Sequence, residues 1–189
     1  MSPNATSAEW EPDGPLGQTL EKIAEITAIL GGFVLVAVML IESASVIGRG
    51  LAGILPVRSI AGDSELVQIG GAIAIFAFLP YCQLRRGNVF VDFFTKGLPV
   101  RARSFLDFIA NVLYLALAFA IALQLVHATK EKFEYADTTT VLRLPESWPY
   151  LISTVLAWFL VIAICYSILR SAREIHRRKL IGPQPSGEH

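Results

Sequence analysis

Glu42 has the clearest potential for chemistry, because it is a carboxylate within a long apolar stretch of the sequence. A charged side chain at membrane depth is costly to bury and usually has a function. Two interpretations are open: Glu42 carries a proton, or it pairs with a group on a partner helix. Ser43 and Ser45 follow it and favour a polar stripe facing protein, and Arg49 lies seven residues further on, about 10 Å along a helix. We favour the structural role.

The histidines and cysteines do not form a recognisable metal or redox site. His127 is the only histidine inside an apolar segment, whereas a haem-binding membrane anchor needs two axial ligands. Cys82 and Cys165 lie in separate apolar segments without CxxC or Cys/His spacing, so we expect them to be small packing residues. The sequence also lacks a nucleophile–base pair, a phosphate-binding glycine loop and paired carboxylates. It therefore predicts no enzyme, no cofactor and no metal site.

Four long apolar segments carry these residues. Of the 189 residues, 53% are hydrophobic and 17% are charged, whereas a soluble domain usually has about a quarter charged residues. A membrane-spanning helix needs about 20 predominantly apolar residues, and buried soluble helices rarely stay uncharged for so long. The sequence therefore predicts an all-α membrane protein with four transmembrane helices, at about 23–47, 66–84, 108–129 and 147–169.

The distribution of basic residues predicts the orientation of these helices. Of the 16 lysines and arginines, 11 fall in the N-terminal segment, the second connection and the C-terminal segment, and five fall in the first and third connections. The positive-inside rule places the richer side in the cytoplasm. We therefore expect both termini inside and the first and third connections outside. The formal net charge of zero gives no indication of a nucleic-acid partner.

The four-helix domain, which we place at residues 17–170, is flanked by two tails. Residues 1–16 are rich in Pro, Gly and Ser and contain no Lys or Arg, which predicts a flexible cytoplasmic tail rather than a signal peptide. Residues 171–189 are expected to form a basic cytoplasmic tail.

The connection between the second and third helices contains a short amphipathic segment. Asn88 suits a helix N-cap, and Gly97 followed by Pro99 suits the end of a helix. Asp92 and Lys96 have the spacing of an i, i+4 ion pair. We expect a short interfacial helix here, on the membrane surface or against a partner helix. An ordinary connecting loop is the alternative.

Small residues in the first two helices predict close helix packing. Ala28 and Gly32, and likewise Gly70 and Ala74, have the small-xxx-small spacing that allows membrane helices to approach each other.

Several motifs occur in an order that is typical of one family of membrane subunits. They are Arg49, Gly62-Asp63-Ser64-Glu65, Leu79-Pro80-Tyr81, Arg86-Gly87-Asn88-Val89-Phe90-Val91-Asp92, Thr138-Thr139-Thr140, Leu144-Pro145 and Trp148. Over about residues 20–170, the chain resembles the small membrane subunit of tripartite ATP-independent periplasmic (TRAP) transporters, the DctQ family. Glu42 departs from the pattern, because a neutral or amide residue is expected there.

The resemblance implies a helper role. In that family, the small subunit supports a large elevator-type permease subunit coupled to sodium, and a periplasmic substrate-binding protein delivers an organic acid. It therefore implies a scaffold subunit in the bacterial inner membrane, with the large permease subunit, the binding protein and membrane lipids as partners. The residues that select the substrate would belong to the other two proteins.

Six charged residues are candidates for partner or lipid contacts. We expect Glu42 to meet a partner helix, and Asp92 to hold the interfacial helix. Asp63 and Glu65, on the outer side, are expected to contact the binding protein or the large subunit. Arg85 and Arg86 are expected to contact lipid phosphates.

The main alternative is a small proton-coupled antiporter that works alone and uses Glu42. Such antiporters also have four helices with a glutamate in the first, but the connections here are long for so compact a transporter. A membrane anchor of a redox enzyme is a second alternative, and the lack of a second histidine at membrane depth argues against it.

Overall fold

The computed structural model describes residues 10–11, 13–51, 61–85, 100–177 and 180–181. Within these ranges, four helices are long and apolar enough to cross a membrane, which confirms the predicted number of spans. They are α1 (Pro15–Leu51), α2 (Asp63–Leu84), α4 (Val100–Glu134) and α5 (Ser147–Arg177). The predicted interfacial helix lies outside the described residues.

All four helices are longer than the apolar segments that predict them. Helix α1 has 37 residues, about 55 Å of helix, whereas the hydrocarbon core of a bilayer is about 30 Å thick. It begins at Pro15, a residue whose fixed φ and missing N–H suit the first turn of a helix. The prediction of a flexible tail over residues 1–16 therefore differs from the structure at Pro15 and Leu16, which are helical.

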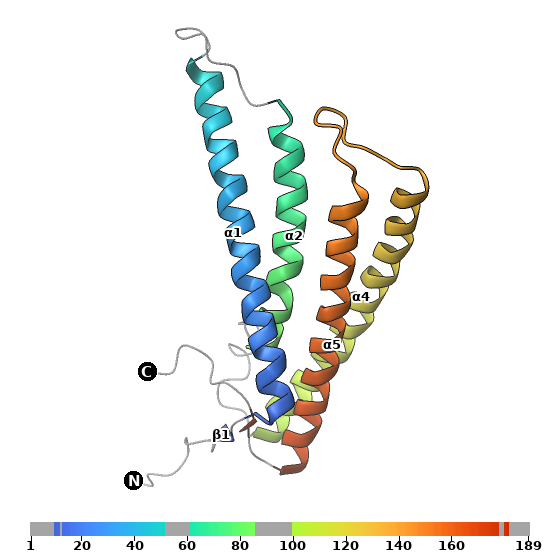
Figure 1. The fold of residues 1–189 in the computed structure, drawn as a ribbon. Coiled ribbons are helices and arrows are strands. Elements are labelled where there is room, and N and C mark those ends of the chain that lie inside the picture. Colours follow the sequence, from blue (N-terminus) through green and yellow to red (C-terminus); the bar gives the residue numbers. More distant parts are fainter. Residues whose placement is uncertain (1–9, 12, 52–60, 86–99, 178–179, 182–189) are drawn as a thin grey trace.

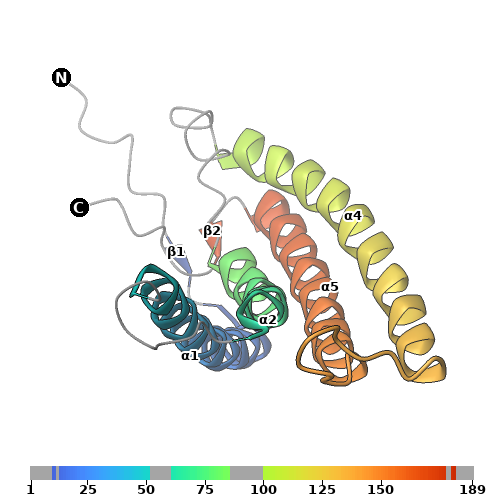
Figure 2. The ribbon, with the colours of Figure 1, turned by 90° about the horizontal axis from the view of Figure 1, so that it is seen from above.

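The helices form an open row rather than a closed bundle. Helix α1 packs on α2, α2 packs on α5, and α5 packs on α4. Figure 2 shows this order, with α1 and α4 at opposite ends of a curved layer. Both outer helices therefore have a neighbour mainly on one side, which leaves much of their apolar surface uncovered by the described chain.

The contact between α1 and α2 depends on glycines that allow close approach. A Cβ on Gly31 would lie 2.7 Å from the Cβ of Ala77, and a Cβ on Gly70 would lie 2.3 Å from a methyl group of Val38. The prediction for the second helix is therefore confirmed at Gly70. The prediction for the first helix is wrong by one residue, because nothing lies within 4 Å of the corresponding position on Gly32.

Polar side chains join the other helices at membrane depth. The hydroxyls of Thr129 on α4 and Thr154 on α5 lie 2.7 Å apart, and both residues are buried. The Gln83 amide of α2 donates to Asn111 of α4 at 2.6 Å. Lipid cannot satisfy such groups, so bonds of this kind fix which helices are neighbours.

A short strand pair brings the two ends of the described chain together. Strand β1 (Trp10–Glu11) pairs in parallel with β2 (Leu180–Ile181), a feature that the all-α prediction does not include. We call this end of the row the termini end (Figure 1). The opposite end carries the last turn of α1, the first turn of α2 and the α4–α5 connection, and we call it the loop end. The direction in which the row crosses the membrane stays a prediction.

Substituting leucine at the two adjacent glycines of α1 should have opposite outcomes. Gly31→Leu should destabilise the protein by about 1–3 kcal/mol, because its side chain would overpack the contact with α2. Gly32→Leu is the matched control, since its side chain enters open space. Thermal unfolding in detergent measures the difference, and equal effects of the two substitutions would contradict the packing described here.

Candidate functional site

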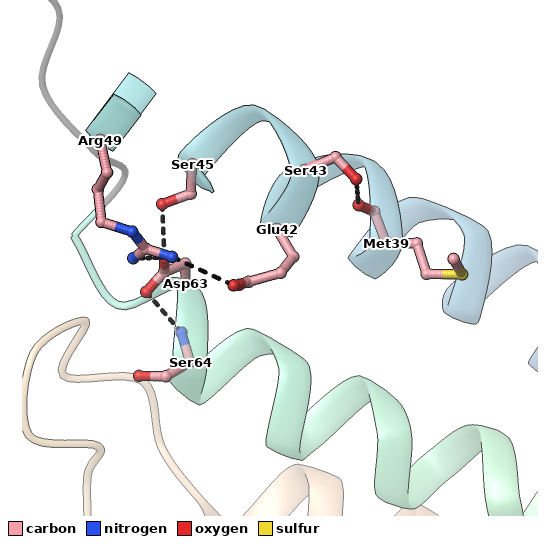
Figure 3. Close-up of polar contacts among 7 residues, drawn as sticks. All are labelled: Met39, Glu42, Ser43, Ser45, Arg49, Asp63 and Ser64. Carbon is pink, nitrogen blue, oxygen red and sulfur yellow. Dashed lines mark hydrogen bonds and ion pairs between the residues drawn. The ribbon is translucent and has the colours of Figure 1, made fainter. Parts of the chain in front are cut away.

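A polar cluster joins α1 and α2 at the loop end (Figure 3). The Arg49 guanidinium of α1 lies 2.6 Å from Asp63 Oδ2 of α2 and 3.3 Å from Glu42 Oε1. Ser45 is fully buried, and its hydroxyl donates to the same Asp63 oxygen at 2.5 Å. The cluster therefore holds two carboxylates, one guanidinium and one hydroxyl at the mouth of the α1–α2 hairpin.

Asp63 is at the centre of this cluster because of where α2 begins. It is the first residue of α2, where a negative charge interacts favourably with the helix dipole. Its second oxygen, Oδ1, accepts the backbone N–H of Ser64 at 2.8 Å. Gly62 precedes it with φ of 83°, a left-handed conformation that glycine adopts without steric cost. The local sequence therefore aims the Asp63 carboxylate at α1.

The structure gives Glu42 a partner on its own helix. Its carboxylate meets Arg49, two turns further along α1, and both side chains are partly exposed. The expected polar stripe is correct for Ser45, which faces α2, and wrong for Ser43, which is exposed and donates to the Met39 carbonyl of its own helix. A contact of Glu42 with a partner helix stays a prediction.

Glu65 holds the α4–α5 connection against α2. Its two carboxylate oxygens accept the backbone N–H groups of Val141 and Leu142 at 2.8 and 3.0 Å. The Leu142 side chain packs on Gly62, where a Cβ would lie 2.4 Å from it. Glu65 therefore has an intramolecular role, and its expected contact with a partner protein stays a prediction.

The connection itself, residues 135–146, is fixed by its own bonds. Lys132 forms ion pairs with Asp137 at 3.0 Å and with Glu146 at 2.7 Å. The Thr139 N–H donates to the Leu144 carbonyl at 2.9 Å, and the Leu144 N–H donates to the Thr139 hydroxyl at 3.0 Å. We call this segment the outer loop.

Two outer-loop residues other than glycine have positive φ, Ala136 at 49° and Arg143 at 52°. Such residues cost free energy and persist where the surrounding bonds determine the conformation. The outer loop therefore has a conformation that its own hydrogen bonds and ion pairs determine.

A cleft of about 390 Å³ lies beneath the outer loop, between α2 and α5. Its lining is polar near the outer loop and largely apolar further along α2. The lining residues are Glu65, Gln68, Ile69, Ala72, Phe76, Leu125, Thr139, Thr140, Glu146, Pro149, Tyr150 and Ser153.

A second polar cluster closes the termini end. Asp13 Oδ1 accepts the Tyr166 hydroxyl at 2.6 Å, and Asp13 Oδ2 lies 3.4 Å from the Arg170 guanidinium. Arg170 also donates to the Leu84 carbonyl at the end of α2, at 3.2 Å. A Cβ on Gly17 would collide with the Tyr166 hydroxyl. Removing one partner of a buried pair is strongly destabilising, so this cluster holds α1, α2 and α5 together.

Sequence reasoning missed this second cluster. Asp13 lies within the stretch predicted to be flexible, and Arg170 marks the end of the fourth apolar segment. No local pattern connects two residues so far apart in the sequence. Arg170 is 3% exposed. Predicting that it is buried would have required knowledge of which helices are neighbours.

The remaining predicted residues have different surroundings. Arg85, a predicted lipid contact, forms a 2.6 Å ion pair with Glu21 and lies over the Tyr81 ring. Arg86 and Asp92 lie outside the described residues. Cys82 and Cys165 are exposed free thiols rather than packing residues between helices.

Comparison with protein families gives a match, over residues 38–174, to the family described as "Tripartite ATP-independent periplasmic transporters, DctQ component". The chain belongs to this family. Comparison with curated proteins and with solved structures gives no match. The matched region covers the whole loop-end cluster, the outer loop and Arg170, whereas Asp13 precedes it. This DctQ protein is a multi-pass inner-membrane protein and a small subunit of a TRAP transporter, in a family of transporter components.

The loop-end cluster predicts an order of stability effects. Asp63→Ala should lower the thermal unfolding midpoint in detergent more than Glu42→Ala. Asp63 binds Arg49 and Ser45 across two helices, whereas the one contact of Glu42 among the described residues is the longer bond within α1. A larger loss for Glu42→Ala would contradict this assignment.

The bonds of Glu65 predict the protease sensitivity of the outer loop. Glu65→Ala should speed trypsin cleavage after Arg143, which is exposed, because the loop would lose two backbone anchors. Ser64→Ala is the matched control, since Ser64 is exposed and its bond to Asp63 comes from its backbone N–H, which the substitution keeps. Equal cleavage rates in the two variants, measured by mass spectrometry, would show that Glu65 does not hold the loop.

Proposed function

We propose that this DctQ protein is the scaffold subunit of a sodium-coupled, binding-protein-dependent uptake system for an organic acid. It supports the large elevator-type permease subunit and has no transport activity alone. The observation that carries the proposal is the family match over residues 38–174. The open row of helices supports it, because a row leaves broad apolar faces for a larger membrane partner.

These faces belong mainly to the two outer helices. Many large apolar side chains of α1 and α4 are exposed in the described chain. Lipid or a partner subunit covers such surface in a membrane. Examples are Phe33 at 70%, Leu40 at 66%, Leu113 at 68% and Leu117 at 59% exposed.

The chemistry of the cleft also supports a helper role. Its lining includes Glu65 and Glu146 and contains no Lys, Arg or His. Organic acids are anions, and a transporter usually binds them with basic side chains or helix N-termini. Glu65 accepts two backbone N–H groups and Glu146 pairs with Lys132, so these carboxylates give an anion no positive group to bind. In this proposal, the substrate is therefore selected by the large subunit and the binding protein.

The outer loop is the proposed docking area for the periplasmic binding protein. With both termini in the cytoplasm, as the positive-inside rule favours, the loop end faces the periplasm. Val141, Leu144 and Trp148 are exposed there, at 55%, 41% and 59%. Glu65 fixes the backbone of Val141 and Leu142, and Asp63 fixes the adjacent α1–α2 hairpin, so both residues act by positioning this surface rather than by touching the partner.

Co-purification tests the proposal. The tagged chain, expressed with the large permease subunit of the same transporter, should purify as a stable complex. Sodium-driven uptake in proteoliposomes, assayed with labelled succinate, pyruvate and sialic acid, should require both membrane subunits and the binding protein. The chain alone should give no uptake.

The result that would overturn the proposal is transport by this chain alone. Uptake or efflux driven by a proton gradient and abolished by Glu42→Gln would instead support a self-sufficient antiporter. The Glu42→Gln variant of the complete complex should retain sodium-driven uptake, because Glu42 contacts Arg49 at the edge of the loop-end cluster.

A further inference from the structure

The four helices form two hairpins, and each hairpin is packed over most of its length. In the first, α1 contacts α2 from Gly31, where the helices approach closely, to Arg49, which pairs with Asp63 at 2.6 Å. In the second, α4 and α5 share a buried apolar cluster, and nearer the loop end Thr129 bonds to Thr154. Contacts of this extent make each hairpin a single body.

The two hairpins are joined firmly at the termini end. Ala24 of α1, Leu84 of α2 and Ala163 of α5 are 0–2% exposed and belong to one apolar cluster. The Arg170 guanidinium of α5 donates to the Leu84 carbonyl at 3.2 Å and also meets Asp13, which precedes α1. Apolar packing and buried polar bonds therefore act together at this end.

Nearer the loop end, a gap in the packing lies between the hairpins. The cleft of about 390 Å³ is lined by α2 on one side and by α5 on the other. Ala72 of α2 is exposed there, whereas Ala77 and Leu84, further along the same helix, are buried. Atoms that face a gap lack the dispersion contacts of a packed interface. Packing therefore stabilises the contact between the hairpins less here than at the termini end.

Glu65 connects the two hairpins at the loop end of this cleft. Its carboxylate on α2 accepts the N–H groups of Val141 and Leu142 in the outer loop, which lies beside the start of α2 (Figure 1). In the part of the chain that the structure describes, the hydrogen bonds between the hairpins at the loop end all involve Glu65. The ion pairs of Lys132 fix the outer loop to its own hairpin.

We propose that the row of helices is hinged: the two hairpins pivot at the termini end, and the bonds of Glu65 with the outer loop hold them together at the loop end. A hinge of this kind moves two packed bodies about one shared contact. Helix α2 has 22 residues, so a rotation of about 10° at its termini end moves its loop end by roughly 6 Å. The Glu65 bonds therefore set the width of the cleft and the angle between α1 and α4. This property belongs to the chain itself, with or without a partner.

Distances between spin labels test the hinge in the full chain in lipid nanodiscs. The two native cysteines are replaced by alanine, and nitroxide labels are attached to exposed positions on α1 and α4. One pair, at Ile47 and Lys130, spans the loop end, and the other, at Ile23 and Phe105, spans the termini end. Glu65→Ala should broaden the loop-end distances and shift them by several ångströms. The termini-end distances should stay unchanged.

Glu42→Ala is the matched control, because it removes one carboxylate from the same end but from a contact within α1. It should leave both sets of distances unchanged. Unchanged loop-end distances in Glu65→Ala would overturn the proposal, since other contacts would then hold the hairpins together. Equal broadening at both ends would also overturn it, because the row would then loosen as a whole instead of pivoting.

Thiol modification in detergent gives a second measurement. Ser153 lines the cleft and is 5% exposed, whereas Ala157, one turn further along α5, belongs to the buried cluster shared with α4. In chains without the native cysteines, Glu65→Ala should speed modification of Ser153→Cys by a water-soluble maleimide several-fold. The rate at Ala157→Cys should not change. No increase at Ser153→Cys would contradict opening of the cleft, and circular dichroism checks that each variant retains its helices.

Discussion

Every polar side chain between these helices must find its partner within protein, because the hydrocarbon of a membrane offers no hydrogen bonds. This constraint explains where the helices meet. Thr129 meets Thr154 between α4 and α5, and Gln83 meets Asn111 between α2 and α4. Asp63 meets Arg49 and Ser45 at the loop end, just outside the predicted spans, and joins α1 to α2 there.

These bonds have particular weight because lipid weakens the usual driving force for helix association. Hydrocarbon tails are as apolar as leucine, so burying leucine between helices gains little. Close contact through small residues such as Gly31 and Gly70 adds dispersion attraction between the helices. Polar hydrogen bonds determine which faces of the helices meet. An open row can be stable on these terms, although each outer helix has only one main neighbour.

The number of helices and the family could be predicted from the sequence because both depend on local properties. The length of uncharged stretches gives the spans, and short ordered motifs give the resemblance. The contacts of single residues depend on rotation about the helix axis, and one residue changes that by about 100°. For this reason the small-residue prediction chose Gly32 where Gly31 makes the contact, and Ser43 was grouped with Ser45 although they face different ways.

Contacts between distant parts of the chain were beyond sequence reasoning altogether. Glu65 was recognised as a candidate, but its bonds to Val141 and Leu142 depend on α2 lying beside the α4–α5 connection. The termini-end cluster requires knowing that α1, α2 and α5 end at the same level. Its members have no motif in common.

That cluster has a consequence for how the protein is made. A ribosome synthesises the chain from its N-terminus, so Asp13 leaves it long before Tyr166 and Arg170 exist. The bonds between them, and the strand pair beside them, form only after the fourth helix has entered the membrane. The contacts of Asp13 with α5 are therefore among the last to form as the four helices pack together.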